Sequence, residues 1–470
     1  MILLILLHMF FVSFTDKPEK SAPALSERAI EQRAKWSIPT DELDYPVCSM
    51  YLDSLRRMGA DIQHTSRWFN GATCAMSDSL AAQVAQLSFV TDVEKTRDDS
   101  RSPLSLRKLM QNRQDSTAVK MWSKAQQIVY NLLPLHEAGF EGQGILMTIC
   151  DGGFESSDTL SCYRRDSLEL GHFDFTDNPY SFYGEGPGSF HGNNCLSFIT
   201  AIQEGYHGAA TQAKYYLMRS EEGYTESPKE LDNLVAALEK ADSLGTNVFS
   251  CSLGYHHFDN PEWNLEHSML DGRFTRASRA ATIAARKGML VCVAAGNEGD
   301  KNWVKITVPA DADSILSVGA VGYDSICGDF SSYGPSADGR VKPEVCAVGE
   351  LAIYIEPNGE IYLGDGTSYA TPLLAGLAAS LWSALPDENA MQIRERIIRS
   401  AHLYPNHDAD NQLGYGVPDA WKAYTMTLLQ GIDNSQCTIQ NSQCTKELHD
   451  GQVLILRGGK TYDVTGRQVQ

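Results

Sequence analysis

The chain has 470 residues, of which 43% are apolar, and its 59 acidic against 39 basic side chains give a formal net charge of −20. This length exceeds what one small core needs and suits one large domain with smaller accessory parts. The negative charge argues against nucleic acid and an anionic membrane surface as partners, because their phosphates would repel the protein.

The chain begins with an apolar run over residues 2–13, which is too short to cross a bilayer but has the length of a signal-peptide core. We therefore expect residues 1–15 to be a signal peptide, and the protein to be secreted or held at the cell surface or in the periplasm. A misassigned start and an interfacial anchor are the alternatives. No later segment looks transmembrane, so we expect no membrane span in the mature protein.

Two further segments precede the main domain. Residues 16–46 are charged and contain proline, which predicts a linker. Short strand-like and helix-like pieces alternate over residues 47–95 and predict a compact α+β domain. Residues 96–124 are polar, which predicts an exposed linker that is open to cleavage.

Over residues 125–427, apolar runs rich in Val and Ile alternate with helical periodicity, a pattern typical of βαβ units and a mainly parallel sheet. The strands are apolar almost throughout, so helices should cover both faces of this doubly wound sheet. The expected strands are Ile145–Cys150, Lys214–Met218, Asn247–Ser252, Leu290–Ala294 and Ile315–Val321. The expected helices are Asn194–Glu204, Pro228–Leu244, Thr275–Lys287, Ser368–Leu385 and Asn389–Ala401. Residues 428–470 should form a short β-rich tail.

The eleven cysteines are an odd number, so at least one has no partner within the chain. Cys150, Cys251 and Cys292 lie in apolar runs and are expected in the core. Two pairings are open in an oxidising compartment. They are Cys48 with Cys74 and Cys437 with Cys444. No spacing resembles a zinc site, and we name no metal ligand.

A candidate nucleophile lies in the run from Gly366 to Pro372, where Ser368 opens an apolar helix. The first N–H groups of a helix have no partner within it and carry the positive end of the helix dipole. An oxyanion that forms beside Ser368 would therefore be stabilised there.

A serine nucleophile also needs a base and a group that orients the base. Asp151 ends a buried strand and precedes two glycines, so its carboxylate should lie at the carboxyl-end edge of the sheet, although an Asp-Gly turn is the plain alternative. His191 opens a helix and can accept the serine proton while its other ring nitrogen donates to Asp151. A helix cap is the plain alternative for His191, and His207 is its nearest rival.

Asn297 lies in a turn between Gly296 and Gly299, directly after a buried strand. Its amide can donate to the oxyanion alongside the Ser368 N–H. A routine left-handed turn residue is the alternative.

These four residues, in the chain order Asp, His, Asn and Ser, make residues 125 to 425 resemble the subtilisin-like serine proteases. The resemblance extends to the segments 252–255, 294–296, 308–310, 330–335 and 342–345. It implies an endopeptidase that uses Asp151, His191 and Ser368 as catalytic triad and Asn297 in the oxyanion hole. The polypeptide substrate would lie as an extended strand against two segments. These are Ser252, Leu253 and Gly254, and Ala294, Ala295 and Gly296.

The same resemblance makes residues 47–95 similar to inhibitory propeptides of this family. They would assist folding, block the cleft as an intramolecular inhibitor and be cut away; a permanent accessory domain is the alternative. The tail resembles sorting segments on exported proteins of Bacteroidetes-type bacteria. The chemistry requires no cofactor. Calcium is a possible structural ion by family resemblance. The acidic side chains that offer oxygens for it are Asp158, Asp174, Asp177 and Asp300.

Two rivals remain at this stage. One is a catalytically silent binding module with the same fold. The other is the related group of acid-active serine-carboxyl peptidases, which His191 in the base position disfavours.

Overall fold

The protein was analysed as a computed structural model that describes residues 7–18, 22–98, 123–408, 410–427, 444–449, 452–457 and 460–462. The chain divides into two compact units, residues 1–434 and 435–470. Each unit is described by itself.

The centre of the first unit is a seven-stranded sheet in the order β13-β12-β11-β10-β5-β9-β6, in which every neighbouring pair of strands is parallel. The strands in that order are Val345–Val348, Leu316–Val321, Leu290–Ala294, Val248–Cys251, Leu146–Asp151, Lys214–Arg219 and Glu169–Asp174. The predicted fold class is confirmed, and all five predicted strands are present. The two outer strands, β13 and β6, were not predicted.

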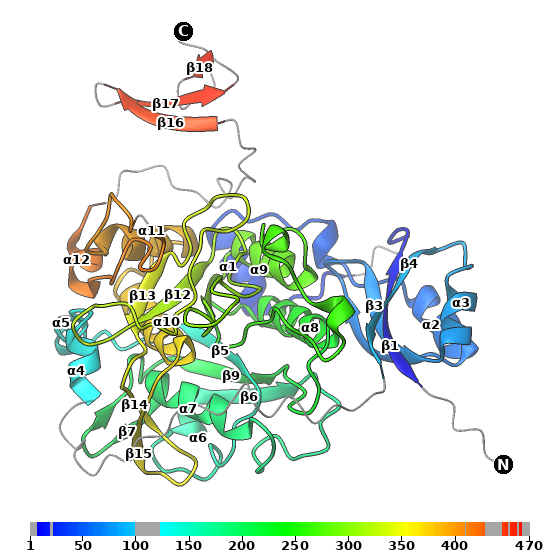
Figure 1. Ribbon diagram of the computed structural model, residues 1–470, viewed down its shortest axis with the longest axis horizontal. Coiled ribbons are helices and arrows are strands. Elements are labelled where there is room, and N and C mark those ends of the chain that lie inside the picture. The colour runs from blue at the N-terminus through cyan, green and yellow to red at the C-terminus, as the bar shows by residue number, and fades with distance from the viewer. Residues whose placement is uncertain are drawn as a thin grey trace. The chain divides into compact units, whose positions relative to one another are not determined.

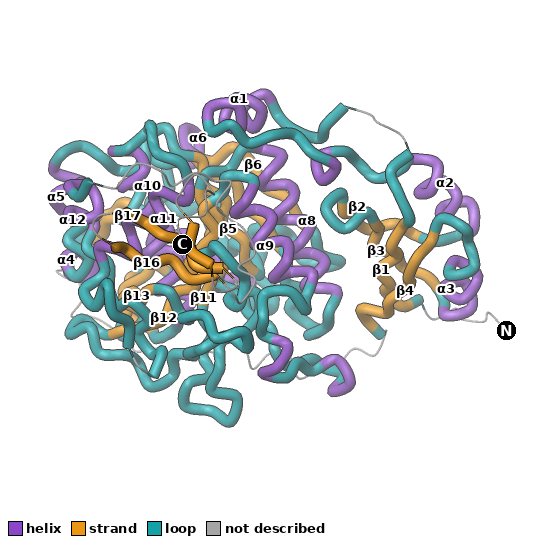
Figure 2. The backbone as a smooth tube through the Cα atoms, turned by 90° about the horizontal axis from the view of Figure 1, so that it is seen from above, coloured by secondary structure: helices purple, strands orange, loops and turns teal. Residues whose placement is uncertain are grey.

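Helices cover both faces of this sheet, as Figures 1 and 2 show. Helices α8 (Lys229–Leu244) and α9 (Arg276–Arg286) pack together and share a core with β10 and β11. The opposite face carries α7 (Ser189–Thr200) and α10 (Thr367–Ala384). The other α-helices among the described residues from 123 to 427 are α4 (Ser123–Ile128), α5 (Leu133–Glu137), α6 (Arg165–Leu168), α11 (Ala390–Ser400) and α12 (Ala420–Thr425). Short strands form two hairpins, β7 (Ile202–Gln203) with β8 (Tyr206–His207) and β14 (Ala352–Ile355) with β15 (Ile361–Gly364).

An antiparallel sheet in the order β2-β3-β1-β4 forms the N-terminal domain. The strands in chain order are His8–Phe14, Asp61–Ser66, Gly71–Met76 and Val90–Arg97, and the domain's helices are α2 (Ser49–Met58) and α3 (Asp78–Val84). The expected α+β domain is therefore present, but it starts near residue 8 rather than at 47.

The expectation of a signal peptide over residues 1–15 is wrong for residues 8–14, because these form the internal strand β1, paired on both edges. Phe10 and Val12 belong to the core of the N-terminal domain. Phe11 is also buried, and the Arg276 guanidinium lies 4.2 Å from the centre of its ring. A strand that is covered on both faces carries few polar side chains, and this gives it the composition of a leader.

The expected linker over residues 16–46 contains helix α1 (Glu27–Lys35), which Ser26 caps by accepting the Ala29 N–H. Arg33 of this helix is buried and pairs with Asp44 at 2.6 Å and with Asp242 of α8 at 2.7 Å. The segment is therefore a docked part of the fold rather than a linker. Most of the second predicted linker, residues 96–124, lies outside the described residues.

Charged and polar contacts join the N-terminal domain to α8 and α9. The Ser66 hydroxyl donates to Glu239, His64 Nε2 lies 3.1 Å from Asn233 Oδ1, and Arg276 pairs with Glu94. Each of these contacts joins one partner from residues 61–97 to one from the main domain, so specific hydrogen bonds and ion pairs hold the two domains together.

The second unit contains three antiparallel strands, β16 (Cys444–His449), β17 (Gln452–Arg457) and β18 (Lys460–Tyr462). This agrees with the expected β-rich tail. Among the described cysteines, Cys48 and Cys74 are both free and buried, so the structure does not pair them. Cys150, Cys251 and Cys292 are buried in the core as expected, whereas Cys437 lies outside the described residues. No helix in the described part of the chain is long and apolar enough to cross a membrane.

Candidate active site

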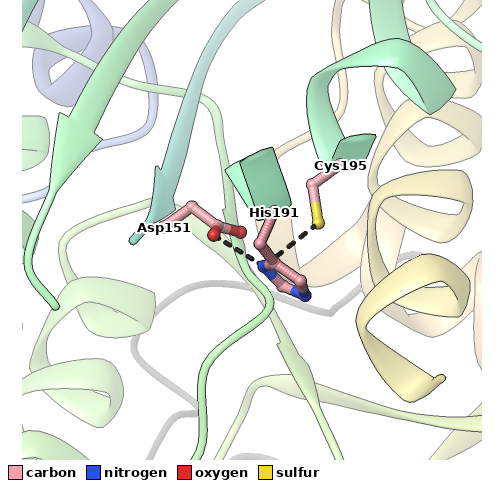
Figure 3. A group of neighbouring side chains, drawn as sticks. All are labelled: Asp151, His191 and Cys195. Carbon is pink, nitrogen blue, oxygen red and sulfur yellow. Dashed lines mark hydrogen bonds and ion pairs between the residues drawn. The ribbon is translucent and has the colours of Figure 1, made fainter. Parts of the chain in front are cut away.

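Asp151 and His191 form a buried pair at the carboxyl end of β5. The Asp151 Oδ1 and His191 Nδ1 atoms are 2.7 Å apart (Figure 3), and neither side chain is more than 1% exposed. Asp151 Oδ1 also accepts the Gly152 N–H at 2.7 Å. The carboxylate is therefore fixed before any substrate arrives, and it orients the ring so that Nε2 is left for the reaction.

The glycine that follows His191 explains why the pair can form. A Cβ atom on Gly192 would lie 2.1 Å from the Gly153 carbonyl oxygen and 2.9 Å from Asp151 Cβ. Only a residue without a side chain lets α7 approach the end of β5 this closely.

The Asp151 carboxylate also changes the proton affinity of His191. Burial disfavours the imidazolium, but the Asp151 carboxylate, together with the Cys195 thiol beside the ring, outweighs burial, and the pKa of His191 is raised well above its usual value. The pair is thus arranged to stabilise the imidazolium that forms when the ring takes a proton.

Ser368 lies in the first turn of α10, and its hydroxyl donates to the Ser252 carbonyl oxygen at 3.1 Å rather than to His191. Ser368 and His191 nevertheless line the same cleft. A rotation about the Cα–Cβ bond of Ser368 changes this hydrogen bond without moving the backbone. Catalytic hydrogen bonds are often longer or differently aligned before substrate binds.

A proline inside α10 determines how the Ser368 backbone is held. Pro372 has no N–H, so the Ser368 carbonyl lacks the helical partner four residues later. The Ser252 hydroxyl donates to this carbonyl at 2.9 Å and the Cys195 thiol at 3.4 Å. The loss of one helical hydrogen bond therefore ties the nucleophile's backbone to β10 and α7.

Cys195 is a site residue that the sequence analysis missed. Its sulfur lies 3.9 Å from His191 Nδ1 (Figure 3), and burial raises the pKa of its thiol, so it stays protonated and does not compete as a nucleophile. Its spacing of four residues from His191 was the available signal, because residues i and i+4 share a helix face. The Cys195 sulfur, a ring nitrogen of His191 and a carboxylate oxygen of Asp151 all lie within 4.8 Å of one another.

The side chain of Asn297 is held in one orientation. Its Oδ1 atom accepts the Thr367 N–H and the Thr367 hydroxyl, each at 2.9 Å. Since the oxygen is engaged, the Nδ2 donor is left for a ligand in the cleft, which Asn297 also lines. The first-turn N–H of Ser368 has no partner within the helix and supplies a second donor.

A cleft of about 660 Å³ brings most of the predicted site residues together. Its lining includes His191, Ser252, Leu253, Gly254, Ala294, Gly296, Asn297 and Ser368. Ala295 differs: it is buried, its N–H donates to the Val318 carbonyl, and its own carbonyl accepts the Thr307 N–H. Both backbone groups are thus used within the protein, and Ala295 is not among the described residues that line the cleft, so the substrate contact expected there remains a prediction.

Two of the acidic residues that were considered for calcium have cationic partners. Asp174 pairs with Arg219, and Asp177 pairs with Arg97 at 2.8 Å and with Lys229 at 2.9 Å. These carboxylates are thereby neutralised within the protein and serve its structure.

Comparisons with known proteins identify the family. Residues 142–416 match the Subtilase family, and residues 9–114 match the Peptidase S8 propeptide domain of Bacteroidota. Subtilisin NAT of Bacillus subtilis subsp. natto and Subtilisin E of Bacillus subtilis (strain 168) are each 28% identical over 284 residues, which is 58% of this chain. The aligned region spans only 64% of the length of each of these two relatives.

The fold also matches solved structures. The crystal structure of MycP1 from Mycobacterium smegmatis superposes with a TM-score of 0.54 at 20% identity, covering 70% of this chain and 91% of the other. The propeptide match begins at residue 9 and so covers nearly all of strand β1, in agreement with the pairing of this strand inside the antiparallel sheet. With its fold, its cleft and this match over more than half of its length, the chain belongs to the subtilase family, with a Bacteroidota-type propeptide domain at its N-terminus.

Proposed function

We propose that this protein is a secreted serine endopeptidase that hydrolyses peptide bonds through Asp151, His191 and Ser368. The observation that carries the proposal is the buried 2.7 Å contact between Asp151 and His191 beside a cleft that also contains Ser368. Family membership supports the same reaction class.

In the proposed mechanism, substrate binding turns the Ser368 hydroxyl from the Ser252 carbonyl to His191 Nε2. His191 takes the proton as Ser368 attacks the scissile carbonyl, and Asp151 stabilises the imidazolium. Asn297 Nδ2 and the Ser368 N–H donate to the oxyanion. His191 then protonates the leaving amine, and water hydrolyses the acyl-enzyme by the reverse sequence. No cofactor takes part.

The N-terminal domain is the proposed intramolecular inhibitor. Its match to a propeptide domain supports this role, and also supports export, since a propeptide keeps a peptidase silent until it reaches its destination. The prediction of export is not supported by residues 1–15, because residues 8–14 form a strand. Mass spectrometry of active protein should find an N-terminus within or beyond residues 99–122. An intact N-terminus in active protein would contradict the propeptide role.

Hydrolysis of unfolded casein tests the peptidase, with each protein purified from the full chain, treated alike to remove the N-terminal domain and checked for that removal by mass spectrometry. We expect turnover by the wild type and by Ser380→Ala, which removes a buried hydroxyl of the same helix that donates to the Ala209 carbonyl. Ser368→Ala should lose turnover by roughly a million-fold. Equal turnover in Ser368→Ala would contradict the mechanism, and no turnover in the folded wild type would favour a binding module.

A further inference from the structure

Carboxylates line one end of the cleft. Seven acidic residues of the described lining share the cavity with His191 and Ser368, and four of these, here called the acidic end, act on one another electrostatically. They are Asp324, Asp329, Glu350 and Asp365.

The sheet order explains how these residues gather beside the nucleophile. Asp324 follows β12 and Glu350 follows β13, and these are the two strands beyond β11, the strand that leads to Asn297. A Cβ atom on Gly322 would lie 3.0 Å from Asp324 Oδ1 and 3.2 Å from Glu350 Oε2, so the two carboxylates flank this glycine. Asp365 lies three residues before Ser368, and its Oδ1 atom accepts the Leu351 N–H at 2.7 Å.

The acidic end has no counter-ion among the described residues. Lys301 is the only lysine or arginine in the described lining, and it pairs with Glu298 at 3.0 Å. Partial burial and the three neighbouring carboxylates raise the pKa of Glu350. Like charges held together in a cleft repel one another, and a cationic group that enters the cleft relieves this repulsion.

A second, independent observation points to the same kind of ligand. The sequence between the propeptide domain and the peptidase domain, residues 99–122, contains five basic and two acidic side chains in a chain whose net charge is −20. The basic residues are Arg101, Arg107, Lys108, Arg113 and Lys120. The segment in which processing is expected is thus basic, whereas one end of the cleft is acidic.

We propose that the acidic end selects polypeptides with Lys or Arg close to the scissile bond, and that the chain's own residues 99–122 are the first such substrate. The inference rests on the proposed peptidase function and names its substrate class. Substrates with acidic residues at the same positions are excluded by repulsion.

The test uses active protein obtained from the full chain, with its active sites counted by a fluorophosphonate probe. Quenched octapeptides carry Lys, Ala or Glu at each position in turn, and EDTA is present so that no divalent cation occupies the carboxylates. We expect kcat/KM to be about tenfold higher for Lys than for Ala at one or two neighbouring positions, as for a cation beside several partly exposed carboxylates. This preference should shrink as the salt concentration rises.

The double variant Asp324→Asn with Glu350→Gln should reduce the Lys-to-Ala ratio to near one. The matched control is Glu204→Gln, an exposed acidic residue outside the cleft, which should keep the wild-type ratio. The new N-terminus of processed protein should lie within two residues of a basic side chain of residues 99–122.

Protein that the probe shows to be active, but that cleaves the Lys, Ala and Glu peptides equally well, would overturn the inference and leave the peptidase function standing. A calcium-dependent activity that the double variant loses, without any preference for Lys, would overturn it in favour of a cation site. Folded protein that takes no label would overturn the peptidase function itself.

Discussion

Two regions of the molecule use charge in different ways: the surface by which residues 16–97 contact the peptidase domain, here called the docking surface, and the cleft of the peptidase domain. At the docking surface, buried cations meet carboxylates: Arg33 pairs with Asp44 and Asp242, and Lys287 pairs with Asp44 at 2.9 Å. In the cleft, the acidic end has no cation among the described residues. A surface with neutralised charges suits a stable contact within the folded chain, whereas a cleft with unpaired charge suits a ligand of the opposite charge.

The largest expected effect separates the two regions most clearly. Asp151→Asn should lower turnover about 10⁴-fold, because an amide neither fixes the His191 tautomer nor stabilises its imidazolium. Chemical denaturation should show that the N-terminal domain stays docked, since Asp151 is not part of that surface. Peptide hydrolysis, corrected for active-site concentration, measures the loss. Turnover within tenfold of wild type would mean that the Asp151–His191 pair has only a structural role.

A substitution at the docking surface should lower the free energy of unfolding rather than turnover. Arg33→Ala leaves two buried carboxylates, Asp44 and Asp242, without one of their cations and should cost about 3 kcal/mol of unfolding free energy. Denaturation of a Ser368→Ala background measures this without self-cleavage. Arg56→Ala removes an exposed pair with Asp53 and should cost less than about 1 kcal/mol. Equal costs for the two variants would contradict a buried ionic anchor.

Asn297→Ala tests the centre of the cleft alone. It removes one oxyanion donor and should slow turnover about 100-fold. The fold should survive, although Thr367 loses its acceptor. Steady-state kinetics should show the loss in kcat more than in KM, because the oxyanion exists only after attack. An effect confined to KM would contradict the assigned role.

The smallest expected effect is the pH profile. His191 must be neutral to accept the Ser368 proton, and its pKa is raised because Asp151, together with Cys195, outweighs burial. The rate constant kcat/KM should therefore fall up to about tenfold per unit as pH drops below this raised pKa, with a midpoint above the usual value of about 6.5. An acid limb centred below 6.5 would contradict the electrostatic description of the pair.

The sheet and its main helices followed from the sequence because their patterns are strong and local. Every predicted strand is present, and β11 has the predicted bounds. Where prediction failed, the burial came from tertiary packing. Strand β1 is largely apolar because both of its faces are covered. Helix α1 looked like a linker because one of its two buried side chains is Arg33, whose partner Asp242 is distant in the chain.

In the candidate site, too, local patterns could be predicted and contacts between distant segments could not. Residue types and spacing were enough to select Asp151, His191, Asn297 and Ser368, because each follows a strand or opens a helix of the predicted sheet. The bond from Ser368 to the Ser252 carbonyl and the place of Ala295 in the core depend on contacts between distant segments. No single-residue pattern contains that information.

The most direct test of the central claim is to map a fluorophosphonate adduct on the active protein by mass spectrometry. We predict one adduct, on Ser368, which forms in the wild type and is lost when His191→Ala removes the base. An adduct on another serine, or labelling of Ser368 that does not depend on His191, would contradict the account.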